Sequence, residues 1–264
     1  MGEVEALLDR LRSGNGLSVE EIALLGPASI PAIRPLALSS DPRVRRSALI
    51  ALSELRATGC EDVYQHAILE ADDDAVYIAL EGLERVLEPR HEPALLAAYD
   101  ARPEGTIRGA IARTLGTLEG RADFWAFKKR ADAEQDEEAK EGVLFALARM
   151  GDGPARAEIL RRLPGAKREF LERHFEYLKA PWLLKPLLPL LDDQEVLFDS
   201  RSLFHGQPGA PIPEAFRSSE RVCDRVLGWV AAIAGRSFSF PVQRLVHYAP
   251  EQIEEVRAFL RSLP

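Results

Sequence analysis

The sequence predicts an all-α protein in which about six helical pairs stack into an α-solenoid with a cap at each end. Three observations predict this fold. Apolar residues recur at helical spacing, the segments that carry them recur every 31 or 32 residues, and no stretch alternates apolar and polar residues at the period of a strand. The chain has 264 residues, of which 46% are apolar and 29% charged, which is enough for a substantial core.

The first copy of the repeated segment occupies residues 41–55. Val44, Ala48 and Leu52 fall on one face of a helix. Asp41 stands where a side chain caps the first turn, and Pro42 suits the first helical position, which needs no N–H group. We therefore expect an amphipathic helix that begins at Pro42.

Five further copies repeat this apolar stripe. The first stripe residues follow one another at intervals of 32, 31, 32, 31 and 52, namely Val44, Val76, Ile107, Ala139, Phe170 and Val222. A shorter helical segment precedes each copy, at 29–38, 61–70, 92–100, 122–133, 153–163 and 181–191. Asp73, Glu104 and Asp136 occupy the capping position in the next three copies, and Ser219 occupies it in the last. A two-helix unit of this length cannot bury its own apolar face, so neighbouring units must stack.

The domain organisation follows from these intervals. We predict one domain with an N-terminal cap at 1–26, five regular repeats at 27–191 and an insertion at 192–218. A sixth repeat helix and a C-terminal cap, with a last helix at 250–263, complete it at 219–264.

Residues 41–52, with the sequence DPRVRRSALIAL, resemble the second helix of a bacterial HEAT repeat of the short kind also found in phycobilin lyase subunits. Residues 25–33 resemble the first helix of such a unit. The resemblance implies that the basic residue after the capping Asp bridges neighbouring repeats. Arg45, Arg108 and Lys140 keep that residue, whereas Tyr77, Leu171 and Cys223 do not. The resemblance covers 24–190 well and 215–235 more weakly, and it implies a fold rather than a function.

Residues able to carry catalysis form no convincing group in the sequence. No two of the five histidines have the i, i+4 spacing of a helical metal site, and His174 occupies an apolar stripe position that favours an interior histidine. Asp199, Ser200, Ser202 and His205 supply the residue types of a triad without a nucleophile elbow. Asp224 would raise the pKa of the Cys223 thiol, which favours a structural cysteine. We therefore expect that the protein is not an enzyme, that it has no catalytic residue and that it binds no metal or cofactor.

The charge pattern argues against a nucleic-acid partner. The net charge is −8: residues 1–153 hold 18 basic and 28 acidic side chains, and residues 154–264 hold 16 and 14. Phosphate binding needs a surplus of Lys and Arg. Two segments are rich in basic residues. The segment 124–130 combines them with aromatic residues, and in the segment 156–173 they are mainly arginines. Glutamates dilute the second, and the aromatic residues of the first match the buried face of a repeat.

The sequence also suggests a compartment. Residues 1–6 lack the basic and apolar regions of a signal peptide, and no window approaches the roughly 18 uncharged apolar residues of a membrane span. Only Cys60 and Cys223 are present, which fits a reducing environment. We expect a cytoplasmic protein that does not bind membranes and is a monomer rather than a homo-oligomer.

The outward face of the second helices is the first candidate binding surface, because these helices usually line the concave surface of a solenoid. That face is predicted to carry apolar residues among arginines: Arg46, Ile50, Ile78, Arg85, Arg113 and Phe145. Glycines 82, 109 and 116 would let another chain approach closely. Arg85 and Arg113 are then expected to contact a protein partner and to contribute little to folding. The alternative is that the apolar residues pack on adjacent repeats.

The insertion is the second candidate, with Phe204, His205 and Gln207 at its centre. These observations favour a non-enzymatic scaffold or adaptor that captures a protein partner. Two alternatives stay open: an immunity or inhibitor protein that neutralises a cognate partner, and, from another class, a HEAT-like lyase or DNA-repair enzyme.

Overall fold

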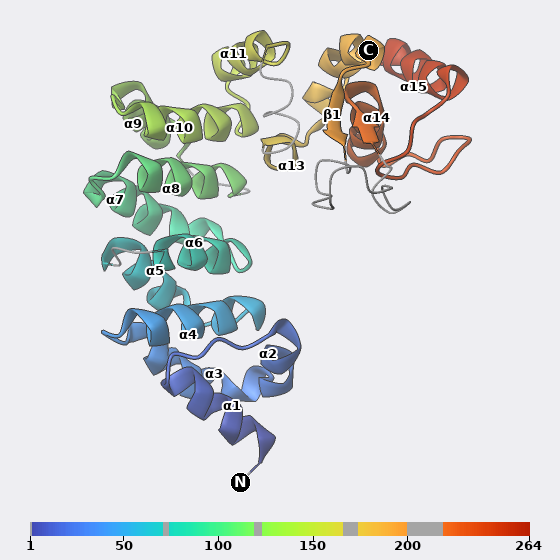
Figure 1. Ribbon diagram of the computed structural model, residues 1–264. Helices are drawn as coiled ribbons and strands as arrows, with labels where there is room; N and C mark the ends of the chain where they lie inside the picture. Colours follow the sequence, from blue (N-terminus) through green and yellow to red (C-terminus); the bar gives the residue numbers. More distant parts are fainter. Residues whose placement is uncertain (1, 71–73, 119–122, 166–173, 200–218) are drawn as a thin grey trace, which may run out of the picture. The chain divides into compact units, whose positions relative to one another are not determined.

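The chain is mostly helical, which confirms the predicted all-α class (Figure 1). The computed structural model describes residues 2–70, 74–118, 123–165, 174–199 and 219–264. Its residues group into two compact units, 1–156 and 157–264, where the sequence predicted one domain. The two units are described separately below.

Residues 1–156 form helical pairs close to the predicted positions. A cap of α1 (Glu3–Arg12) and α2 (Val19–Leu25) comes first. The first helix of each pair is, in order, η1 (Pro27–Ser29) with α3 (Ile30–Ile33) and η2 (Arg34–Leu38), α5 (Glu61–Glu70), α7 (Glu92–Ala101) after η3 (Pro89–His91), and α9 (Phe124–Ala133). The second helices are α4 (Pro42–Glu54), α6 (Ala75–Glu84), α8 (Gly105–Thr117) and α10 (Glu137–Arg149).

Capping residues explain where several of these helices begin. Asp41 Oδ1 accepts a hydrogen bond from Arg43 N at 2.8 Å, as the sequence predicted. Asp136 Oδ1 accepts from Glu138 N at 2.9 Å and from Ala139 N at 3.1 Å. Glu104 stands at the cap of α8 without a side-chain cap bond, and Asp73 lies outside the described residues. Two of the expected caps are therefore confirmed.

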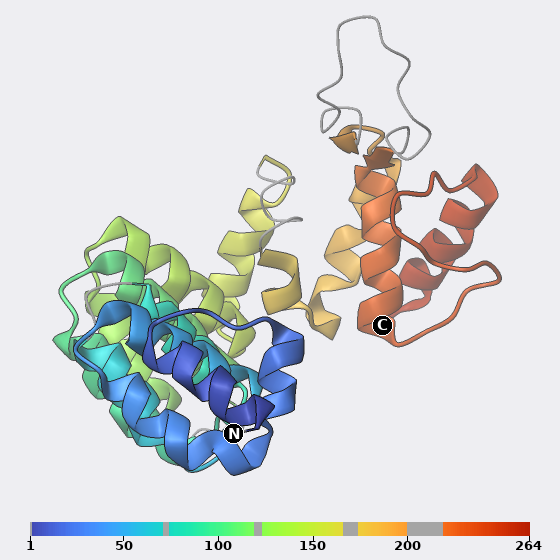
Figure 2. The same cartoon turned by 60° about the horizontal axis from the view of Figure 1, so that its bottom comes forward.

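The second helices follow one another through the first unit. Helix α4 packs on α6, α6 on α8 and α8 on α10, and Figure 1 shows these helices as successive layers. Figure 2 shows the same unit with its N-terminal cap (blue) turned to the front. The predicted stripe forms the core between them. Ala48, Leu52, Val76, Ile111 and Ala146 are fully buried. Burying apolar surface stabilises the folded state by about 25 cal/mol per Å². The buried stripe is therefore the main source of stability in the unit.

Polar bridges join residues 28 to 33 positions apart, which is close to one repeat. They connect Arg34 with Asp62, Arg46 with Asp74, Arg85 with Glu54, Arg90 with Glu61, Arg130 with Asp100, Thr114 with Glu84, and Arg102 with the carbonyl oxygen of Leu69. Because the same separation recurs along the unit, each helical pair contacts the next in nearly constant register. Most of these bridges lie at the surface, where each contributes up to about 1 kcal/mol.

Glycines 82 and 109 serve helix packing inside the chain, which corrects their expected role at a partner surface. A Cβ atom on Gly82 would lie 2.6 Å from Tyr64 Cε1. A Cβ atom on Gly109 would lie 3.0 Å from the carbonyl oxygen of Glu138, because α8 and α10 cross closely there. Neighbouring helices therefore occupy the space that a second chain was expected to use.

Residues 157–264 contain shorter and less regular elements. Helix α11 (Gly153–Arg162) spans the unit boundary, and α13 (Phe175–Leu178) is the described part of the fifth predicted copy. Then come η5 (Pro181–Leu183), η6 (Lys185–Asp192), β1 (Val196–Asp199), β2 (Ser219–Arg221), α14 (Val222–Ala234) and α15 (Pro250–Ser262). His174 is buried, as its stripe position predicted.

Two features of this unit differ from prediction. The segment 181–191 forms 3₁₀ turns rather than one α-helix, because Pro186 and Pro189 cannot donate backbone hydrogen bonds. Residues 196–199 and 219–221 pair as antiparallel strands, with Phe198 opposite Glu220 and Asp199 opposite Ser219. The expectation of no strand was therefore wrong at the two ends of the insertion. Ser219 lies in β2, and Arg221 takes the cap position of α14.

Candidate functional site

The predicted groove residues have different environments in the structure. Arg46 is exposed, and Ile50 and Ile78 are half-buried on the adjacent helices α4 and α6. Phe145 is only 6% exposed, and the guanidinium carbon of Arg113 lies 5.5 Å from the centre of its ring. Arg113 and Phe145 thus form a cation–π pair within the chain. The packing alternative holds for Phe145.

Arg85 bridges two successive helical pairs. It donates to the carbonyl oxygen of Ser53 at 3.2 Å, to Glu54 at 2.9 Å and to Glu81 at 2.8 Å. Hydrogen bonds from its guanidinium to Glu54 and then to Glu81 raise the pKa of Arg85, so it stays charged. These contacts give Arg85 a structural role, contrary to the expectation that it contributes little to folding.

We expect Arg85→Glu to lower the free energy of unfolding by about 1–3 kcal/mol, because it removes three hydrogen bonds and brings three carboxylates together. Arg46→Glu is the matched control, since Arg46 is exposed and its acidic contact among the described residues, Asp74, is 3.5 Å away. Urea unfolding of the wild type and the two variants measures the difference. Equal losses for both variants would contradict the structural role of Arg85.

The insertion lies largely outside the described residues. Phe204, His205 and Gln207, and also Ser200 and Ser202, belong to that segment. The strand pair ends at Asp199 and resumes at Ser219. The predicted role of the insertion therefore stays a prediction.

Trp125 is a candidate that the sequence reading missed. Phe127 is fully buried in α9, in agreement with the expected buried face, and Phe124 is half-buried. Trp125, however, is 74% exposed, so the expected buried face was wrong for this residue. Among the described residues its ring makes an edge-to-face contact with Phe124, at 5.3 Å between ring centres. The spacing of these residues along the helix indicates that Trp125 points away from the buried face. Positions 124 and 127 share a face, whereas position 125 is rotated by about 100° from 124.

The basic residues beside Trp125 are largely neutralised by acids of the same unit. Lys128 Nζ lies 3.1 Å from Asp132 and 3.7 Å from Asp152. Arg130 pairs with Asp100 on α7 at 2.7 Å. Phosphate groups would have to compete with these carboxylates for Lys128 and Arg130.

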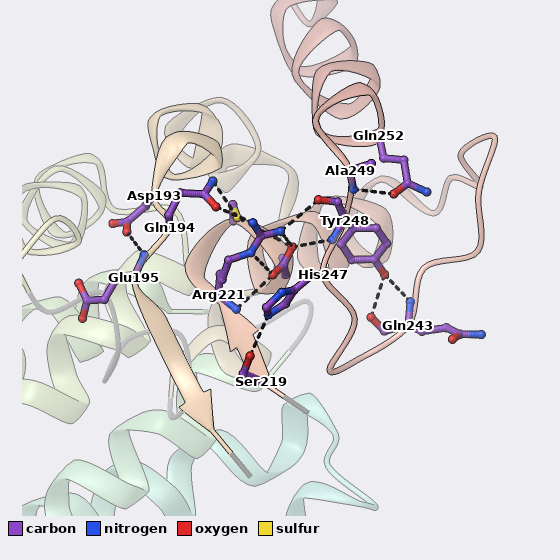
Figure 3. A network of polar contacts seen from close by, with 12 residues as sticks. Asp193, Gln194, Glu195, Ser219, Arg221, Gln243, His247, Tyr248, Ala249 and Gln252 are labelled. Atoms are coloured by element: carbon purple, nitrogen blue, oxygen red, sulfur yellow. Dashed lines mark hydrogen bonds and ion pairs between the residues drawn. The ribbon is translucent and has the colours of Figure 1, made fainter. Parts of the chain in front are cut away.

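A polar network organises the second unit around Arg221 (Figure 3). Arg221 makes a bidentate pair with Asp224, at 2.7 and 2.8 Å, and donates to Gln194 Oε1 at 2.6 Å. It also donates to the carbonyl oxygen of Tyr248 at 3.1 Å. Asp224 is buried, so this pairing compensates for the loss of its hydration. The network joins the end of η6, β2, α14 and the segment before α15.

Two nucleophilic side chains, those of Cys223 and Ser219, lie near this network. Burial, followed by the charge of Asp224, raises the pKa of the Cys223 thiol, as the sequence predicted. Ser219 Oγ lies 2.9 Å from His247 Nε2, but within the described part of the chain no carboxylate contacts His247. A serine–histidine pair without an orienting acid is an incomplete triad.

An open pocket of about 600 Å³ lies beside the network, between η6 and α15. Its polar groups include Arg221 and Arg257. Asp192 and Glu254 pair with Arg257, and Asp224 pairs with Arg221, so both cations are already compensated. Nothing in this lining selects one class of ligand.

Comparisons with known proteins identify no relative: no protein-family model, curated protein or solved structure matches the chain. The resemblance to HEAT repeats therefore stays a prediction. Within the described ranges, no group of three or more His, Cys, Asp or Glu side chains could hold a metal ion. In the same ranges no single helix is long and apolar enough to cross a membrane, although the bent pair of segments Val19–Leu25 and Pro27–Leu38 passes the length and composition test.

Proposed function

We propose that this chain is a non-catalytic, protein-binding α-solenoid of HEAT-like helical pairs that acts as a scaffold or adaptor. The observation that carries the proposal is the exposure of Trp125 on α9. The stacking of α4, α6, α8 and α10, and the bridges one repeat apart, support the solenoid arrangement.

An exposed tryptophan contributes little to folding, since most of its ring stays in water. In a protein interface the same side chain buries about 150–250 Å² and is among the residues that most often dominate binding energy. Its place on the first helices differs from the predicted groove, where Phe145 is buried and Arg85 and Arg113 already contact groups of the chain itself. The acids that pair with Lys128 and Arg130 favour a polypeptide over a nucleic acid.

We expect Trp125→Ala to reduce capture of the partner about tenfold or more and to leave the melting temperature within about 2 °C of the wild type. Leu38→Ala is the control, because Leu38 is also exposed and belongs to the same unit. Affinity capture by the tagged full chain, quantified by mass spectrometry, and thermal unfolding measure the two effects. Capture of one protein in stoichiometric amount would favour an inhibitor function, and capture of several proteins would favour a scaffold function. If Trp125→Ala captured the partner as well as the wild type does, Trp125 would not be part of the binding surface.

A further inference from the structure

The segment 243–248, here called the Leu245 loop, combines exposed apolar side chains with a backbone that hydrogen bonds close on itself. Leu245 and Val246 are each 37% exposed, and they are adjacent in the chain. Leu245 has a φ of +60°, in the left-handed region that a branched aliphatic residue rarely adopts. Such a conformation costs roughly 1 kcal/mol or more and persists only where the surroundings impose it.

Tyr248 imposes this conformation from one end of the loop. Its hydroxyl donates to the carbonyl oxygen of Gln243 at 2.8 Å and accepts from Gln243 N at 2.6 Å, so the loop is closed on itself (Figure 3). Tyr248 N donates to the buried Asp224 at 3.0 Å, and Arg221 holds the carbonyl oxygen of Tyr248. His247 is in turn hydrogen-bonded to Ser219. The loop is thus fixed to β2 and α14.

Arg244 places a positive charge beside the apolar pair. Its side chain is 73% exposed, and its acidic contact within the described residues, Glu220, is 3.8 Å away. Glu220 is already hydrogen-bonded to Arg225, with Arg225 Nε at 2.8 Å. The guanidinium of Arg244 therefore remains accessible to an external carboxylate.

We propose that the Leu245 loop is a preformed docking element for a partner protein whose apolar socket takes Leu245 and Val246 and whose rim carries a carboxylate for Arg244. This inference rests on the proposed protein-binding function and adds a surface in the second unit. The hydrogen bonds of Tyr248 hold the loop before binding, which lowers the conformational entropy lost on binding, and the strained backbone at Leu245 is a feature typical of binding sites. A membrane is the weaker occupant, because two aliphatic side chains and one cation fall short of the two membrane signals that stable anchoring requires.

The first test separates docking from folding. Leu245→Asn introduces a residue type that tolerates the left-handed conformation, so the melting temperature of this variant should equal or exceed that of the wild type. Its affinity for the partner should nevertheless fall about tenfold or more. Val196→Ser, at another exposed apolar position of the same unit, is the control and should bind as the wild type does. Unchanged affinity in Leu245→Asn overturns the inference.

The second test identifies the occupant. Val246 in the full chain is replaced by the photo-crosslinker benzoylphenylalanine, and the attached peptides are sequenced by mass spectrometry. We expect attachment to one other protein, at apolar residues next to Asp or Glu, and a loss of affinity in Arg244→Glu that Arg244→Lys largely restores. Attachment to a second copy of this chain, or co-sedimentation of the wild type with phosphatidylglycerol vesicles, overturns the proposed partner.

The two proposals fail differently. If Trp125→Ala loses capture and Leu245→Asn does not, the Leu245 loop is excluded and the protein-binding function stands. If the wild type captures nothing above a tagged unrelated protein, both the function and the loop proposal are overturned.

Discussion

Gly142→Ala is expected to lower the free energy of unfolding by about 3–5 kcal/mol, among the largest effects of a single methyl group in this chain. A Cβ atom on Gly142 would lie 2.2 Å from the carbonyl oxygen of Gly109 and 2.5 Å from its Cα atom. Both contacts are with the backbone of α8, so no side-chain rotation relieves them. The gain in helix propensity from Gly to Ala, about 1 kcal/mol, is too small to offset the separation of two long helices.

Gly109→Ala tests the same crossing from the other side and provides a graded control. Its Cβ atom would meet the nearest atom, the carbonyl oxygen of Glu138, at 3.0 Å. A shift of a few tenths of an ångström removes that contact, so helix propensity and steric cost nearly cancel, and we expect a change within about 1 kcal/mol. Urea unfolding followed by circular dichroism measures both variants. Equal stabilities of Gly142→Ala and the wild type would show that α8 and α10 do not cross as the structure has them.

The helices and their caps could be predicted from the sequence because their causes are local. Asp41 and Pro42 mark the start of α4, and the apolar stripe from Val44 marks its buried face, as the structure confirms. The role of Gly142 and Gly109 could not be predicted in this way. A glycine in a helix is compatible with a partner surface or with an internal crossing, and only the path of the neighbouring helix separates the two.

The candidate site was less predictable for a related reason. Position on the outward face correctly left Ile50 and Ile78 partly exposed, but the arginines on that face bond to residues about one repeat away. The pairing of Arg85 with Glu54 depends on the register between helical pairs, which the stripe alone does not define. The strand pair at Val196 and Arg221 joins residues on either side of an insertion, so no local pattern indicated it.

Glu134 is expected to be the most important charged residue for the stability of the first unit. Its carboxylate accepts from Arg108 Nε at 2.9 Å and Nη2 at 3.0 Å, and from the Tyr99 hydroxyl at 2.7 Å. Glu134 follows the end of α9, Arg108 lies in α8 and Tyr99 lies in α7, so the network joins two helical pairs. The side chain of Glu134 is 7% exposed, and that of Arg108 is 16% exposed. Glu134→Gln removes the carboxylate that Arg108 contacts directly, and we expect a loss of about 2–4 kcal/mol at pH 7.

The pH dependence gives this prediction a second readout. The hydrogen bonds from Arg108, and then from Tyr99, lower the pKa of Glu134 from its usual 4.5 to about 2 in the folded protein. Because the folded pKa lies below the unfolded one, this stabilisation is complete above pH 4.5 and is lost as the pH falls towards 2. A shift of that size corresponds to about 3 kcal/mol. The stability difference between the wild type and Glu134→Gln should therefore narrow steadily between pH 4.5 and 2.

Glu137→Gln is the control, because Glu137 pairs with Lys140 in an exposed position and should matter little at any pH. A difference between the wild type and Glu134→Gln that stays constant over this range would show that the carboxylate of Glu134 is not held by Arg108.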